Sequence, residues 1–158
     1  FIDAFFFVFP GFGQLNKQLC NPNETIVFAF QVQNQKRVSI CKERNDGYLV
    51  RFGTSFKLEL QFPHVLDSMS WSKFSLKVYN RAGNKQNAAM YFAYLHFNND
   101  GVFYEVYDVW NSENDLREIG VNVKSGSEEI KRKGLVRSHK FTLLSLMNSE
   151  KIKEEEND

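Results

Sequence analysis

The chain has 158 residues, a length typical of one domain that buries its own hydrophobic core. Its 20 basic and 19 acidic residues leave a formal net charge of +1. Such a small charge produces no strong positive potential to attract nucleic acid, and we expect no nucleic-acid partner. Aromatic residues make up 15% of the chain, including 16 Phe and 6 Tyr, and this bias favours β structure.

The first residues resemble a targeting segment. Residues 1–10 are apolar except at Asp3, and the small residues Gly11 and Gly13 follow, as in the apolar region and cleavage site of a secretory signal. We interpret residues 1–13 as a signal-peptide remnant, which predicts a periplasmic or secreted protein. The run lacks an initiator Met and a basic region, so a buried N-terminal strand is the alternative. No other stretch is apolar over the ~18 residues that a transmembrane segment needs.

Two cysteines follow, Cys20 and Cys41. An even pair in an exported chain is typical of a disulfide, and closing this loop would contribute about 3 kcal/mol. The alternative is a pair of small buried thiols in a cytosolic protein. Neither cysteine has a neighbouring His or a C-x-x-C partner, so we expect no metal site.

Strand-like alternation recurs from about residue 24. It is clearest over 56–62, where every second residue is Phe or Leu and the residues between them are polar, which predicts one buried and one wet face. Shorter alternating runs lie at 26–32, 38–40, 48–52, 74–78 and 119–123. Turn residues at 34–35, 45–47 and 81–84 separate several of them.

The clearest hairpin joins 91–97 to 102–109 through Asn98-Asn99-Asp100-Gly101, residues that tolerate positive φ. About seven to nine strands at this spacing predict an all-β, antiparallel sandwich or barrel. We assign residues 14–149 to this single β domain. Sheet edges can pair between chains, so the oligomeric state is left open.

The end of the chain has a different pattern. Phe141, Leu144 and Met147 recur at helical spacing, which predicts a short C-terminal helix. Residues 150–158 are mostly charged, and we interpret them as a disordered tail.

No motif in the chain indicates catalysis or a cofactor. His64, His96 and His139 lack ligand spacing, and no P-loop or nucleophile elbow is present, so we expect a non-enzymatic protein. The best acidic pair is Glu105 and Asp108, but residues three apart on a strand point to opposite faces and cannot flank one glycosidic bond.

Nearby aromatic residues could instead form a platform for a sugar or peptide. On a regular strand Glu105 shares a face with Tyr107, whereas Asp108 shares one with Tyr104 and Trp110. Tyr104, Tyr107 and Trp110 are therefore binding candidates, with a place in the core as the alternative.

Four segments carry a family resemblance: Cys20–Glu24, Lys36–Cys41, Gly47–Gly53 and Glu59–Pro63. They resemble a group of small exported bacterial proteins, mostly labelled hypothetical, with the pattern C-x3-E, K-x-V-S-L-C, Y-L-x-Y-R-F-G and E-L-x-F-P. The resemblance implies an exported bacterial protein.

The chain departs from that group at two cysteines, which are replaced by Phe30 and Arg132. If those cysteines pair in the relatives, Cys20 and Cys41 are left as the remaining bridge. Tyr48 and Arg51, in the segment Tyr48–Gly53, are further binding candidates, and the alternative is that they fix a hairpin.

A more remote resemblance is to the C-type lysozyme inhibitors, small exported β-barrels with a disulfide-tied start. Their inhibitory loop has Ser-Gly followed by Tyr, whereas this chain has Gly53-Thr54-Ser55. We therefore expect an exported binding domain for a protein or a cell-envelope glycan, and lysozyme inhibition is the most specific form of this expected function. An envelope-directed glycan hydrolase or sugar-binding protein and a structural accessory protein are the alternatives.

Overall fold

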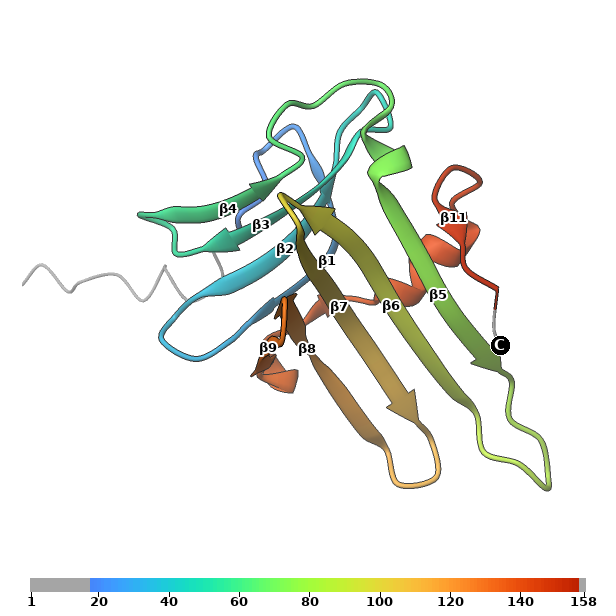
Figure 1. The fold of residues 1–158 in the computed structure, drawn as a ribbon. Coiled ribbons are helices and arrows are strands. Elements are labelled where there is room, and N and C mark those ends of the chain that lie inside the picture. Colours follow the sequence, from blue (N-terminus) through green and yellow to red (C-terminus); the bar gives the residue numbers. More distant parts are fainter. Residues whose placement is uncertain (1–17, 157–158) are drawn as a thin grey trace, which may run out of the picture.

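The alternating segments of the sequence form two sheets (Figure 1), and residues of both sheets make up one hydrophobic core. The computed structural model describes residues 18–156, so the interpretation of 1–13 as a signal remnant lies outside the described residues. The prediction of an all-β fold is confirmed. Of its two versions the structure has the sandwich, because neither sheet closes into a barrel.

The first sheet contains five antiparallel strands. In spatial order they are β10 (Lys140–Phe141), β1 (Thr25–Gln31), β2 (Arg37–Lys42), β3 (Tyr48–Gly53) and β4 (Leu58–Phe62).

The second sheet contains six strands. In spatial order they are β11 (Lys153–Glu154), β5 (Phe74–Arg81), β6 (Met90–Asn99), β7 (Val102–Asn111), β8 (Leu116–Ser125) and β9 (Glu128–Lys133). All neighbours are antiparallel except β11, which runs parallel to β5. Consecutive strands from β5 to β9 pair in order, so short turns suffice to connect them.

The predicted hairpin is present as β6 and β7. Its turn places Asp100 at φ 51° and Gly101 at φ 80°, and the Gly101 amide donates to Asn98 Oδ1 at 3.0 Å. Glycine is needed at this position because other residues rarely adopt such a φ.

Aromatic side chains join the two sheets in the core. Phe62 of β4 stacks on Phe97 of β6 with 4.7 Å between ring centroids, and Phe74 of β5 meets both rings edge-on. These offset and edge-on geometries are the favourable ones for aromatic pairs.

Residues 19–24, which we call the N-terminal segment, lie against the outer face of the first sheet. The predicted disulfide is confirmed, with 2.09 Å between the Cys20 and Cys41 sulfurs. Beside it Arg51 donates to both carboxylate oxygens of Glu24, at 2.6 and 2.9 Å. This buried pair and the disulfide fix the segment to β2 and β3.

The clearest alternating run of the sequence is only half buried. Phe62 is 8% exposed, whereas Leu58 is 46% exposed and Phe56, in the turn before β4, is 90% exposed. The buried end is the one that the second sheet covers, where Phe62 stacks on Phe97 of β6. An apolar row on β4 therefore runs from the core into solvent.

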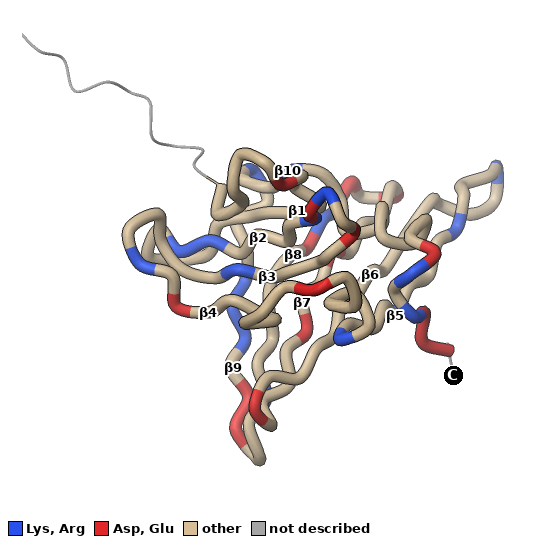
Figure 2. The backbone as a smooth tube through the Cα atoms, turned by 90° about the horizontal axis from the view of Figure 1, so that it is seen from above, with Lys and Arg blue, Asp and Glu red and all other residues tan. Residues whose placement is uncertain are grey.

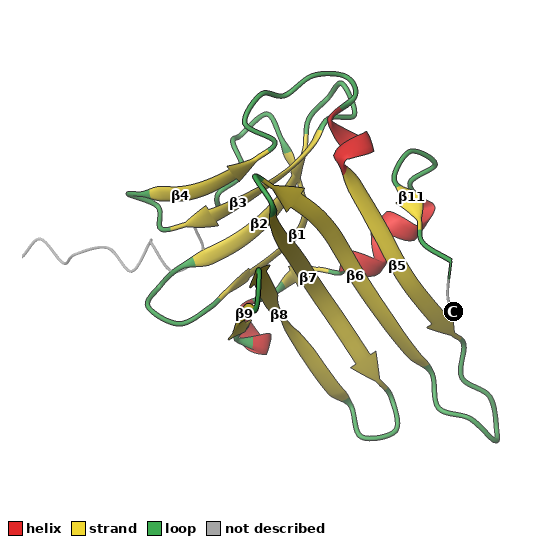
Figure 3. Ribbon diagram, viewed as in Figure 1, coloured by secondary structure: helices red, strands yellow, loops and turns green. Residues whose placement is uncertain are grey.

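Among the described residues, helical structure consists of three short 3-10 segments, η1 (Ser70–Lys73), η2 (Val136–Ser138) and η3 (Leu143–Asn148) (Figure 3). The predicted C-terminal helix is present as η3, but its buried face is different. Leu143 and Leu146 are buried, while Phe141 is 64% exposed and Met147 lies mostly outside the core. Hydrogen bonds from Leu143 and Thr142 to Asp108 set this rotation of the segment.

The interpretation of 150–158 as a disordered tail is wrong for residues 150–156. Ile152 is 4% exposed and belongs to the core, and β11 pairs with β5. The Glu155 amide donates to the Leu76 carbonyl at 2.8 Å. The buried isoleucine and the pairing of β11 with β5 hold these residues against the second sheet.

Candidate binding site between the two sheets

The sequence candidates on β3 hold the fold together. Arg51 pairs with Glu24 and also donates to the Leu19 carbonyl at 2.9 Å and to Gln61 at 2.9 Å. Tyr48 is 6% exposed and lies within hydrogen-bond distance of Ser149. The two residues connect β3 to segments at opposite ends of the chain.

The three aromatic candidates on β7 are not brought together. Tyr104 faces the core and stacks on Phe97 with 4.8 Å between centroids. Trp110 packs near Tyr91 at the far end of the strand. Tyr107 lies on the outer face over Gly120, where a Cβ atom would come within 2.3 Å of its hydroxyl oxygen.

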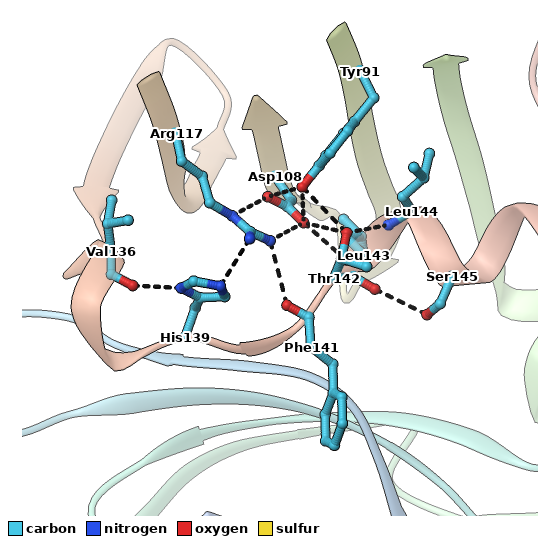
Figure 4. Close-up of polar contacts among 10 residues, drawn as sticks. All are labelled: Tyr91, Asp108, Arg117, Val136, His139, Phe141, Thr142, Leu143, Leu144 and Ser145. Carbon is cyan, nitrogen blue, oxygen red and sulfur yellow. Dashed lines mark hydrogen bonds and ion pairs between the residues drawn. The ribbon is translucent and has the colours of Figure 1, made fainter. Parts of the chain in front are cut away.

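The two acids of β7 lie on opposite faces, as the strand geometry predicts. Asp108 is fully buried and accepts hydrogen bonds from five donor groups, drawn in Figure 4. Two come from Arg117 at 2.8 and 2.9 Å, and the others come from Tyr91, Thr142 and the Leu143 amide. Burial holds the pKa of Tyr91 above its ordinary value, so this hydroxyl stays protonated and can donate.

Glu105 takes part in a different cluster on the outer face of the second sheet. Its two oxygens contact His96 Nε2 and Asn122 Nδ2, each at 2.8 Å. The other nitrogen of His96 contacts Glu155 at 2.8 Å, and Ser75 also donates to Glu155. The cluster attaches the β11 segment to β5 and β6.

This attachment predicts a pH dependence. Burial raises the pKa of Glu155, but hydrogen bonds from Ser75 and His96 outweigh it and the pKa lies below its ordinary value. The stabilisation is therefore complete above about pH 4.3, the ordinary Glu value, and is lost as the pH falls through the lower folded-state pKa. The hydrogen-exchange protection factors of the β11 amides should therefore fall in that range. Glu155→Gln should remove this pH dependence, whereas the exposed Glu154→Gln should leave it, and equal behaviour of the two variants would contradict the assignment.

A cleft between the two sheets is lined by residues of both, including residues of the edge strands β4 and β9. Its volume is about 260 Å³. We call it the inter-sheet cleft. Its apolar walls are formed by Val38, Val50, Phe52 and Leu60 of the first sheet and by Phe97, Tyr104, Val106, Val121, Val123 and Ile130 of the second.

Two charged residues line the inter-sheet cleft, Glu59 of β4 and Arg132 of β9. Glu59 is paired with Lys36 at 2.9 Å. The Arg132 guanidinium lies 6.0 Å from the centre of the Phe52 ring, a cation–π distance. Arg132 thus connects the two sheets across the open side.

Sequence reasoning assigned one of these lining residues, Tyr104, to a binding role and missed the rest. The signal for Leu60 was present in the alternation of 56–62, but alternation does not tell which part of a face stays uncovered. Arg132 occurs in a strand whose residues are all exposed, and only its pairing with Val121 places it on the inward side. No local pattern reveals that pairing.

Among residues 18–156, Cys20, Glu24 and Cys41 form the one group with ligand atoms close enough for a metal ion. The two sulfurs are joined to each other and Glu24 is paired with Arg51, so these atoms are already committed. Within the same residues, none of the helices has the length and apolar composition to span a membrane.

Comparison of the chain with known protein families, with curated proteins and with solved structures finds no match.

Proposed function

We propose that the chain is an exported, non-enzymatic binding domain that holds part of a protein or cell-envelope component in the inter-sheet cleft. The observation that carries the proposal is the apolar space of about 260 Å³ between two otherwise closely packed sheets. Pockets that bind ligands are typically apolar with a few polar groups, and Arg132 and Glu59 supply those groups here.

The size of this space supports a binding role over imperfect packing. Protein interiors contain few voids larger than a water molecule. The cleft is open on one side, so its apolar walls are exposed to water there. A ligand that fills the cleft removes this apolar surface from water, which favours binding by roughly 25 cal/mol per Å².

Two further features support the location and the class of function. A disulfide such as Cys20–Cys41 persists mainly in oxidising compartments, which supports export. Asp108 and Glu105 are engaged by several partners each and lie on opposite faces, an arrangement that does not favour a pair of catalytic acids.

Filling the cleft is expected to abolish binding without unfolding the domain. Val121 faces the cleft from β8, so Val121→Phe places an aromatic ring in the space that the ligand would occupy. Immobilised wild-type protein should retain one or more components of a bacterial envelope extract, and Val121→Phe should retain less than about a tenth as much, a loss of about 1.4 kcal/mol or more. Val65→Phe, at a 73% exposed loop position, should bind like the wild type.

Retained components are identified by mass spectrometry, and muramidase inhibition is assayed with the same three proteins. Equal retention by wild type and Val121→Phe, with both proteins folded, would contradict the cleft as the binding site. Muramidase inhibition that Val121→Phe abolishes would support the lysozyme-inhibitor version of the proposal.

A further inference from the structure

The open side of the inter-sheet cleft carries two cations around one aromatic ring. Lys36 Nζ lies 5.7 Å and the Arg132 guanidinium 6.0 Å from the centre of the Phe52 ring. Figure 2 shows the basic end of β9 beside β3 and β4, with the acidic residues of β9 at its other end. Glu59 also lines the cleft, so Lys36, Arg132 and Glu59 together carry one net positive charge.

The two cations differ in what neutralises them. Lys36 forms an ion pair with Glu59 at 2.9 Å. Arg132 has no carboxylate partner among residues 18–156. Because Arg132 pairs with the inward-facing Val121, its side chain lies on the cleft side of β9. One unpaired guanidinium is thus available to an anion at the rim.

The interior of the cleft offers little to a polar ligand. Its walls are Val, Leu, Ile and Phe side chains together with the ring of Tyr104. A sugar placed there would bury hydroxyl groups with few partners, at a cost of about 1–3 kcal/mol for each. An alkyl chain carries no such cost, and the apolar row of β4 extends the surface outward from Leu60 to Leu58.

We propose that the inter-sheet cleft binds a fatty acid, with the alkyl chain between the sheets and the carboxylate on Arg132. The inference rests on the proposed function, because it names the ligand class for the same cleft. A guanidinium binds a carboxylate through two parallel hydrogen bonds, which fixes the direction in which the chain enters.

Two ligands of the same chain length test the proposal by calorimetric titration of the full chain. Decanoate should bind one to one and about tenfold more tightly than decan-1-ol, since a charge-assisted hydrogen bond contributes more than a neutral one. Arg132→Gln should weaken decanoate binding about tenfold and leave decan-1-ol unchanged. Lys133→Gln removes the same charge from the outward face of β9 and should change neither ligand.

Equal affinity of the wild type for the two ligands would overturn the assignment of the carboxylate to Arg132. Equal weakening of decanoate and decan-1-ol binding by Arg132→Gln would also overturn that assignment. If the wild type binds neither ligand, but Val121→Phe still loses its retention of envelope components, the fatty-acid proposal is wrong and the binding function stands. If Val121→Phe retains those components as well, both proposals are wrong.

Discussion

Replacing Asp108 with alanine should destabilise the protein by about 3–5 kcal/mol, the usual effect of breaking a buried ion pair by removing one partner. The carboxylate is fully buried and accepts hydrogen bonds from five donor groups, so its loss leaves the Arg117 guanidinium and the Leu143 amide without this acceptor. Urea unfolding followed by circular dichroism measures the change.

Two further measurements test whether the destabilisation comes from the loss of the Asp108 network and not from the loss of an acidic residue in general. Glu113→Ala, at an exposed position of the β7–β8 turn, should change the free energy of unfolding by less than about 0.5 kcal/mol. Amides of η3 should lose hydrogen-exchange protection in Asp108→Ala before those of β2 do, because Asp108 is what fixes η3 to β7. A loss below about 1 kcal/mol would contradict the assigned role of Asp108.

Reducing the Cys20–Cys41 disulfide should cost about 3 kcal/mol, because the bond closes a loop between residues 21 apart in the sequence. For a domain of this size, that corresponds to a fall in Tm of about 6–12 °C. Differential scanning calorimetry with and without reductant measures it, and Cys20→Ala/Cys41→Ala in the absence of reductant should show the same fall.

The native, unreduced protein should also resist thiol alkylation. Modification of both cysteines before reduction would show that the bond is not formed. An unchanged Tm after complete reduction would instead show that Arg51 and Glu24 alone are sufficient to hold the N-terminal segment on β2 and β3.

The elements that could be predicted from the sequence are those set by local chemistry. The β6–β7 hairpin follows from Asp100 and Gly101, which adopt the positive φ that the turn requires. The opposite faces of Glu105 and Asp108 follow from the two-residue period of a strand. These features depend only on residues close in sequence.

The features that were missed depend on contacts between distant segments. Asp108 is buried because Thr142 and Leu143, more than thirty residues later, supply donors to it. Ile152 is ordered because the edge of β5 is open to it. No local pattern in the sequence indicates either contact.

The inter-sheet cleft is also one of the features that depend on contacts between distant segments. The apolar face of 56–62 predicted a strand, but the burial of Phe62 and the exposure of Leu58 depend on where the second sheet ends. Arg132 was noted only as a departure from a family pattern, and its contact with Phe52 arises from the packing of β9 against the first sheet. The candidate site could therefore not be assembled from the sequence.

The central claim is that the inter-sheet cleft is where this domain binds its ligand. Methyl NMR of labelled protein mixed with a detergent-free envelope extract tests it most directly, because valine methyl groups lie both inside and outside the cleft. The account predicts shifts at Val50, Val106, Val121 and Val123 and none at Val109, on the outer face of β7. Shifts confined to the outer face of the second sheet, with the cleft methyl groups unchanged, would contradict it.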